Sequence, residues 1–346
     1  MKYSGGELLL KALKDEGVKF IFGYPGGAAL HIYDAIFRQK YVDHILVRHE
    51  QGATHAADGY SRATGKPGVV LVTSGPGATN AITGLATAFM DSIPLVVISG
   101  QVQSHLIGTD SFQETDMIGV SRPIVKHSYL VQSAEEIPSI VQEAFYIAQT
   151  GRPGPVVIDI PKDKTDPLHK YKYKKPAKPY LRSYQPKIKP HPGQIKKAAK
   201  AILSSERPVI YAGGGAIYSN AAKELSELNK ILKVPVTNTL MGLGVYPAKN
   251  KLFLGMLGMH GTYQANMAMH NADLILAVGS RFDDRITNTP SLFAPNAKIV
   301  HIDVDPASIS KIIKADIPIV GQVKDSLQAL IKEIKRSKIK IDTDAI

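Results

Sequence analysis

The stretch GVVLVTSGPGATN at residues 68–80 decides the fold of this chain. Its run of valine and leucine is typical of a strand buried in a parallel sheet. The glycines that follow form a tight turn, where the backbone can approach a ligand and expose amide donors. The segment ATNAITGLATAFMDS at 78–92 is predicted to continue as a helix. A buried strand that leads through a glycine turn into a helix is the unit of an α/β fold.

The same order of elements repeats on both sides of this stretch, through residue 160. Alternating strands and helices predict βαβ units in a doubly wound, mostly parallel sheet. Strands are expected at 20–24, 43–48, 94–100 and 155–160, and helices at 28–37, 50–65 and 135–151.

A segment rich in lysine, proline and tyrosine, from about residue 162 to 192, separates this first domain from a second α/β domain. We interpret it as an interdomain linker because apolar periodicity disappears there and prolines interrupt any regular element. The fold class is therefore α/β, with two doubly wound, mostly parallel sheet domains. In the second domain, strands are expected at 208–215, 234–239, 273–280, 297–305 and 317–321, and helices at 221–232 and 323–336. The predicted boundaries are 1–165 for the first domain, 166–190 for the linker, 191–336 for the second domain and 337–346 for a tail.

The composition excludes several classes of protein. The net charge of +12 would suit a nucleic-acid partner, but the basic excess falls at 162–200 and 332–340, as on a solvated linker and helix face, so none is expected. The absence of cysteine excludes disulfides and thiolate metal sites. The N-terminus lacks the apolar core of a signal peptide, and no apolar run approaches about 20 residues, so we expect a cytoplasmic protein without a membrane span.

Three strand ends in the first domain carry distinctive segments, at 23–27, 48–52 and 74–80. Ligands of doubly wound sheets bind beyond the carboxyl ends of the strands, which favours a binding site over three plain tight turns. Glu50, in the second segment, is a carboxylate that can become desolvated beside small residues and then hold or share a proton near neutrality. The alternative is a helix-terminal acid stabilised by the helix dipole.

These motifs resemble a known family. GYPGGAALHIYDA at 23–35, the long segment from RHEQG to ISGQV at 48–102, and GTDSFQETD at 108–116 are similar to the pyrimidine-binding domain of acetolactate synthase (acetohydroxyacid synthase) catalytic subunits, which use thiamin diphosphate. The resemblance continues through a Rossmann-like central FAD-binding domain and covers essentially the whole chain. It implies decarboxylation of pyruvate and condensation of the two-carbon unit with a second 2-keto acid. The implied products are 2-acetolactate and 2-aceto-2-hydroxybutyrate, in the first common step of branched-chain amino acid biosynthesis.

The resemblance also implies roles for residues of the first domain. Glu50 resembles the glutamate that hydrogen-bonds N1′ of the aminopyrimidine and activates the cofactor by sharing a proton with it. The other implied catalytic residues are Gln113 and Gly27, the implied cofactor contacts are Tyr24, Pro25, Gly26, Pro76, Asn80 and Phe112, and the implied substrate channel includes Ala28 and Lys162. Taken without the resemblance, Phe112 could be a core residue, Gln113 a solvated loop amide and Lys162 an exposed lysine. Gln103 departs from the family, which commonly has proline there.

The second domain lacks a strict dinucleotide glycine motif but has polar residues near its strand ends. Asp303 and Asp305 resemble the acid that binds an adenosine ribose, and Arg281 and Arg285 could pair with a diphosphate. His260 has no matched His or Cys partner nearby, so we do not expect it to bind a metal. By resemblance, the FAD site comprises Arg152, Gly213, Gly214, Gly215, Thr239, Leu240, Met241, Gly258, Met259, His260, Gly279, Arg281, Asp283, Arg285, Asp303 and Val304.

Members of the family have a third domain, and we find no segment of this sequence that resembles it. There, a Gly-Asp-Gly segment and a later asparagine bind Mg²⁺ and the diphosphate, so we expect no metal ligand in this chain and an inactive chain on its own. The implied partners are pyruvate, 2-ketobutyrate, further copies in a homodimer or homotetramer, a C-terminal domain in cis or from a partner chain, and a small regulatory subunit. Two alternatives stay open: a pyruvate oxidase or 2-keto acid decarboxylase of the same superfamily, and a non-catalytic FAD-binding fragment.

Overall fold

The computed structural model describes residues 2–186 and 189–337 of the chain. These residues form two compact units, which divide at residue 184 and are described separately here. Parts of two sequence predictions lie outside the described residues, namely positions 187–188 of the expected linker and 338–346 of the expected tail. No helix among the described residues is long and apolar enough to cross a membrane.

The first unit is built on a six-stranded, wholly parallel sheet with the strand order β3-β2-β4-β5-β7-β6. The first strand of this sheet along the chain is β2. The chain adds β3 on one side of β2 and then continues on the other side with β4. The carboxyl ends of β2 and β4 therefore form the topological switch point, where such sheets bind ligands. The strands are β2 (Phe20–Gly23), β3 (Asp43–Leu46), β4 (Gly68–Val72), β5 (Leu95–Gln101), β6 (His127–Leu130) and β7 (Val156–Pro161).

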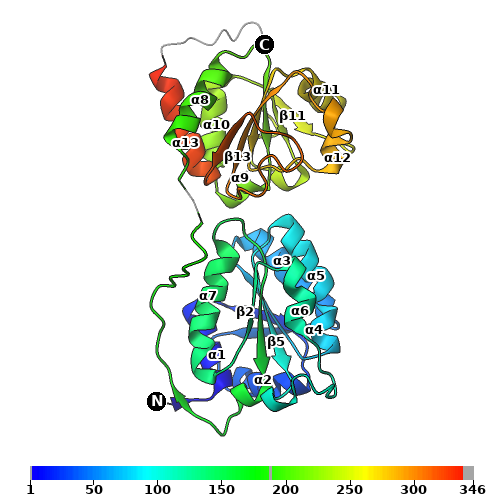
Figure 1. Ribbon diagram of the computed structural model, residues 1–346, viewed down its shortest axis with the longest axis vertical. Helices are drawn as coiled ribbons and strands as arrows, with labels where there is room; N and C mark the ends of the chain where they lie inside the picture. Colours follow the sequence, from blue (N-terminus) through cyan, green and yellow to red (C-terminus); the bar gives the residue numbers. More distant parts are fainter. Residues whose placement is uncertain (1, 187–188, 338–346) are drawn as a thin grey trace. The chain divides into compact units, whose positions relative to one another are not determined.

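Helices cover both faces of this sheet (Figure 1). One face carries α1 (Gly5–Asp15), α2 (Leu30–Phe37) and α7 (Ile137–Gln149), and the other carries α3 (Glu50–Thr64), α4 (Pro76–Asn80), α5 (Ile82–Asp91) and α6 (Met117–Ser121). The central strands are mostly apolar, and all residues of β4, β5 and β7 are buried. Burial on both faces explains why these strands have continuous apolar runs rather than alternation.

Most elements expected in the first 160 residues are present, but the structure differs from the prediction in several places. The helix expected at 78–92 is divided into α4 and α5. Helix α1, closed by a capping box between Ser4 and Glu7, and the edge strand β6 were not expected. Strand β6 has only four residues, so its signal is weak beside the apolar central strands, whereas sequence reasoning missed the amphipathic pattern of the 11-residue α1.

The segment expected as a linker returns to the first unit over much of its length. Strand β8 (Tyr171–Lys172) pairs antiparallel with β1 (Lys2–Tyr3). The Tyr184 hydroxyl donates to the carbonyl of Thr150 over 2.6 Å and accepts from Lys126 Nζ over 2.9 Å. The tyrosines of this segment thus anchor it to the surface of the first unit. The exact bounds of the two domains and of the linker stay a prediction.

The second unit has a six-stranded parallel sheet with the order β11-β10-β9-β12-β13-β14. Here β9 is the central first strand, so β9 and β12 form the switch point. Helices α8 (Pro192–Leu203), α10 (Ala222–Leu232) and α13 (Val323–Arg336) cover one face, and α11 (Tyr263–Asn271) and α12 (Asp284–Thr287) the other (Figure 1). The strands are β9 (Pro208–Ala212), β10 (Val236–Asn238), β11 (Phe253–Met256), β12 (Leu274–Val278), β13 (Lys298–Asp303) and β14 (Ile317–Val320).

Candidate active site

Thr73, directly after β4, holds two glycine loops together at the switch point of the first unit. Its Oγ1 accepts a hydrogen bond from the amide of Ala28 over 3.2 Å. A Cβ placed on Gly26 would lie 2.4 Å from Thr73 Cγ2, and one on Gly77 would lie 2.7 Å from the same atom. Both loops can therefore close on Thr73 only because these two positions are glycine. Sequence reasoning missed Thr73, although it immediately precedes the SGPG turn.

Glu50 is the first residue of α3, and its side chain is buried, with 8% of the residue exposed. Asn80 Nδ2 donates a hydrogen bond to Glu50 Oε2 over 2.9 Å. Oε1 accepts no hydrogen bond from the residues that the structure describes, and a Cβ on Gly77 would approach this atom to 3.3 Å. The structure thus brings together Glu50, Asn80 and the 74–80 turn, and leaves Oε1 available to a hydrogen-bond donor of a ligand.

Tyr33 and His44 form a second polar pair at these strand ends. The Tyr33 hydroxyl lies 3.2 Å from His44 Nε2, and a Cβ on Gly23 would lie 2.9 Å from that hydroxyl. Burial raises the pKa of Tyr33, and the nearby negative charge of Glu50 raises it further. Burial also lowers the pKa of His44. The two groups are therefore neutral at pH 7, and sequence reasoning singled out neither of them.

The loop that carries Phe112 and Gln113 lies against the same turn. Gln113 has a positive φ of 58°, and a Cβ on Gly75 would lie 2.5 Å from its carbonyl oxygen. The backbone of Gln113 is thus fixed beside the Ser74-Gly75-Pro76 turn. Phe112 is 88% exposed and Tyr24 is 42% exposed, so neither is a core residue in this unit. An exposed aromatic side chain beside a glycine turn is suited to contact a bound ring.

The remaining predicted residues of the first unit have different positions. Pro25 lies in the loop between β2 and the Gly27–Ala29 turn of helix, and a Cβ on Gly27 would meet no atom within 4 Å. The Lys162 carbonyl accepts a bond from Thr165 Oγ1 over 2.8 Å, so its backbone starts a short helix after β7. Arg152 Nε donates to Ser92 Oγ over 2.7 Å, at the end of α5. The guanidinium of Arg152 is therefore engaged within its own unit.

In the second unit, the predicted glycines meet at the switch point between β9 and β12. The amide of Gly215 donates to the carbonyl of Gly279 over 2.9 Å, and a Cβ on Gly213 would lie 2.5 Å from that same oxygen. Gly279 has a positive φ of 58°. A Cβ on Gly214 would approach Met241 Cβ to 3.1 Å. The 212–215 loop thus closes on the end of β12 through bare backbone, and Met241 of the 239–242 loop packs against Gly214.

The other predicted FAD residues surround these loops. Thr239 Oγ1 accepts from the amide of Gly242 over 2.9 Å, and the amide of Met259 donates to the carbonyl of Arg285 over 2.9 Å, beside Gly258, whose φ is 101°. Leu240 and Met259 are 68% and 65% exposed. Arg281 Nε lies 3.9 Å from Asp283 Oδ2. Asp303 is the last residue of β13, Val304 follows it, and His260 is exposed. The second unit therefore presents exposed apolar side chains and a cation beside its glycine loops.

Two buried polar groups that the sequence prediction missed, His301 and Tyr211, lie in strands β13 and β9 of the second unit. His301 Nε2 lies 2.9 Å from the carbonyl of Ser280, and Nδ1 has no hydrogen-bond partner among the described residues. Burial lowers the pKa of His301 to about 4, so the ring is neutral at pH 7. The Tyr211 hydroxyl is also buried without a described partner. The ring of Phe282 lies between them, with centroids 5.7 Å from Tyr211 and 5.3 Å from His301.

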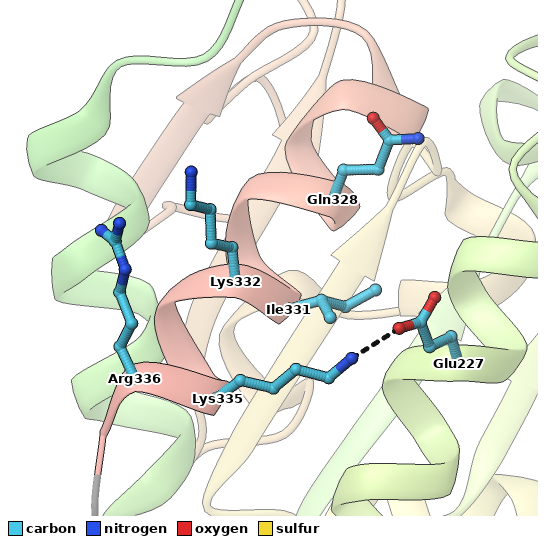
Figure 2. Close-up of a pocket in the computed structure, with 6 residues that line it drawn as sticks. All are labelled: Glu227, Gln328, Ile331, Lys332, Lys335 and Arg336. Carbon is cyan, nitrogen blue, oxygen red and sulfur yellow. Dashed lines mark hydrogen bonds and ion pairs between the residues drawn. The ribbon is translucent and has the colours of Figure 1, made fainter.

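A surface depression between α10 and α13 does not share these features (Figure 2). Lys335 Nζ and Glu227 Oε1 form an ion pair of 2.7 Å across it, beside Lys332 and Arg336. None of its residues belongs to the predicted sites, and Lys335 is already paired with Glu227. Among the described residues, no group of three or more His, Cys, Asp or Glu side chains could hold a metal ion.

Comparison with known proteins assigns a class to this arrangement. Residues 3–120 match the family described as thiamine pyrophosphate enzyme, N-terminal TPP binding domain. Residues 195–330 match the family described as thiamine pyrophosphate enzyme, central domain. The chain therefore belongs to the thiamine pyrophosphate (thiamin diphosphate) enzymes, which confirms the predicted family and the two α/β domains.

Within that family, the chain is similar to the large subunit of acetolactate synthase. It is 58% identical to the acetolactate synthase large subunit of Haemophilus influenzae over 343 residues, which are 99% of this chain and 60% of the relative. It is 55% identical to the isozyme 3 large subunit of Escherichia coli over the same shares of both chains. Identity to acetolactate synthase of Mycobacterium bovis is 48%, over 97% of this chain and 54% of the relative. The chain thus spans about 60% of the length of the curated relatives that it matches most fully.

Proposed function

We propose that this chain supplies the pyrimidine-binding and central domains of an acetolactate synthase catalytic subunit. The proposed reaction decarboxylates pyruvate and joins the two-carbon unit to a second pyruvate or to 2-ketobutyrate. The products are 2-acetolactate or 2-aceto-2-hydroxybutyrate, at the first common step of branched-chain amino acid biosynthesis. The observation that carries the proposal is the buried Glu50 carboxylate, with Oε2 bonded to Asn80 and Oε1 facing the position where Gly77 lacks a side chain.

The residues around Glu50 fit a thiamin-diphosphate aminopyrimidine. Oε1 is available to share a proton with a ring nitrogen, while Asn80 keeps the carboxylate oriented. Burial strengthens such a hydrogen bond because water does not compete for it. When bound, the cofactor supplies an electron sink for the decarboxylation of a 2-keto acid. Tyr24, Phe112 and the backbone of Gln113 are proposed to enclose the substrate side, and Ala28 and Lys162 to line its entrance.

We place FAD in the second unit, at the glycine loops of β9 and β12. Close backbone approach at Gly213 and Gly215 suits a diphosphate, and the exposed Leu240 and Met259 suit a flat ring system. Arg281 is proposed to pair with the diphosphate and Asp303 with a ribose. Arg152 is also proposed as a flavin contact. Mg²⁺ is assigned to a C-terminal domain in cis or from a partner chain.

The proposed assembly is a homodimer or homotetramer in the cytoplasm, with a small regulatory subunit as a further partner. The similarity to proteins named as large subunits supports a second, smaller subunit. We propose neither a nucleic acid nor a membrane as a partner.

The test is complementation. The chain is co-expressed with the part of the Haemophilus influenzae relative that lies outside the 343 matched residues, and the purified complex is assayed with pyruvate. We expect acetolactate formation and a flavin spectrum that pyruvate does not bleach. Flavin reduction by pyruvate would identify an oxidase instead. A yellow complex without turnover would contradict the proposed activity and favour a non-catalytic FAD-binding protein.

A further inference from the structure

A buried polar network crosses β5 and β7 beneath the loop that carries Phe112 and Gln113. Asp159 on β7 is 1% exposed, and its neighbours Ser99 and Gln101 on β5 are also buried. Ser99 and Asp159 are directly opposite each other in the parallel pair, so their side chains lie on the same face of the sheet. None of these three residues has a place in the proposed reaction.

The hydrogen bonds of this network fix the Gln101 side chain completely. Asp159 Oδ1 accepts from Ser99 Oγ over 2.6 Å, and Oδ2 accepts from Gln101 Nε2 over 2.9 Å. Gln101 Nε2 also donates to the carbonyl of Thr115 over 2.8 Å, and its Oε1 accepts from the amide of Val102 over 2.8 Å. Both protons of the amide group and its oxygen are thus used, and one of the protons holds the end of the loop.

A second aspartate holds the start of the same loop. Asp163 accepts from the amide of Ser104 over 2.8 Å and from its hydroxyl over 2.9 Å. Within the loop, Glu114 accepts from the amides of Gly108 and Ser111. The segment 104–116 is therefore closed on itself. Its start is tied to Asp163 after β7, and its end is tied to Gln101 of β5, which bonds in turn to Asp159 of β7.

We propose that Asp159, acting through Gln101, is a positioning residue that sets the 104–116 loop so that Gln113 lies against Gly75 beside Glu50. A carboxylate without a buried cation partner is costly in a sheet interior, where an apolar residue would pack without that cost. Burial raises the pKa of Asp159 to about 7, which reflects this cost. The hydrogen bonds from Ser99 and Gln101 offset part of this cost, and through Gln101 the network gives the loop one conformation. The effect on catalysis rests on the proposed function, but the effect on the loop does not.

Hydrogen exchange of the loop amides tests the positioning role directly. Gln101→Met keeps the side-chain length but removes both donors, so exchange across 104–116 should become about tenfold faster or more, as for the loss of a bond to a charged group. Ser99→Ala is the matched control, because it removes a hydrogen bond from the same carboxylate but has no link to the loop. It should leave exchange at 104–116 unchanged. Equal acceleration in both variants, or none in Gln101→Met, would overturn the proposal.

Two variants of Asp159 separate its role as an acceptor from its role in packing. Asp159→Asn can turn its carbonyl toward Gln101 and its amide toward Ser99 Oγ, so it should restore slow exchange in the loop. Asp159→Ala cannot accept from Gln101 and should match Gln101→Met. If both Asp159 variants behaved alike, the hydrogen bond to Gln101 would not be the cause, and the proposal would fail.

The complemented enzyme adds a kinetic readout. Gln101→Met is expected to lower kcat about tenfold while the affinity for thiamin diphosphate is kept, because Glu50 and Asn80 are untouched. A faster loop with unchanged kcat would show that the loop does not serve the reaction. If no variant and no wild-type complex forms acetolactate, the proposed function fails, whereas the exchange result still decides the positioning of the loop.

Discussion

At the residue scale, the glycines of the first unit are explained by what stands opposite them. Gly77 faces Thr73 Cγ2 and Glu50 Oε1, so its lack of a side chain brings the turn and the carboxylate together. The sequence could indicate a glycine turn at a strand end, and the segment around Glu50 could indicate that this residue is a candidate catalytic carboxylate. It could not indicate Thr73, because a threonine after a buried strand has no pattern of its own and gains its role only from long-range contacts.

Replacing Gly77 tests this packing. In Gly77→Ala, the new methyl group would lie 2.7 Å from Thr73 Cγ2, so the turn or the threonine must shift. We expect a loss of about 1–3 kcal/mol in the free energy of unfolding and weaker thiamin diphosphate binding. Gly59→Ala in α3 is the control, because a Cβ there meets nothing within 4 Å and alanine favours a helix by about 1 kcal/mol. Urea unfolding and titration calorimetry measure both effects, and equal behaviour of the two variants would refute this account of Gly77.

At the scale of single elements, the sequence predicts long apolar strands better than elements at the edge of the sheet. The apolar runs of β4, β5 and β12 allow the sequence to place these strands closely. The edge strand β6 escaped prediction because its pattern is only four residues long, whereas the 11-residue helix α1 has an amphipathic pattern that sequence reasoning missed. Asp159 also escaped prediction, because it looks like one polar residue within an apolar strand until β5 places Ser99 and Gln101 beside it.

The end of β13 gives a prediction on pH. His301 is neutral in the folded unit, with its pKa lowered from 6.5 to about 4 by burial. The unfolded chain therefore binds more protons between these values, so the stability that the neutral ring contributes above pH 6.5 is lost as the pH falls through 4. Between pH 7.5 and pH 5, we expect a loss of about 2 kcal/mol from this group.

The His301→Gln variant isolates that loss, since an amide can still donate to the Ser280 carbonyl but does not titrate. Urea unfolding of the second unit at both pH values should show an acid-induced loss smaller by about 2 kcal/mol in the variant than in the wild-type chain. An identical dependence on pH in the two proteins would exclude His301 as the source.

At the scale of the whole molecule, two α/β units in one chain were predictable because the character of the sequence changes after residue 162 and then returns to strands and helices. The tyrosines within the intervening segment were not expected to pack on the first unit, since an aromatic residue among lysines and prolines is ambiguous. Likewise, the sequence motifs suggest a family, but the orientation of a carboxylate oxygen emerges only when β2, α3 and β4 are assembled. The proposed thiamin diphosphate chemistry therefore depends on Glu50.

The most direct test of that claim is the exchange of the C2 proton of thiamin diphosphate for deuterium in the complemented enzyme. We predict that Glu50→Gln slows this exchange by at least about a hundredfold while flavin content is kept, because glutamine cannot share a proton with the aminopyrimidine. Glu135→Gln, at an exposed glutamate in a first helical turn, should exchange at the wild-type rate. Wild-type exchange in Glu50→Gln, with the cofactor bound, would contradict the account.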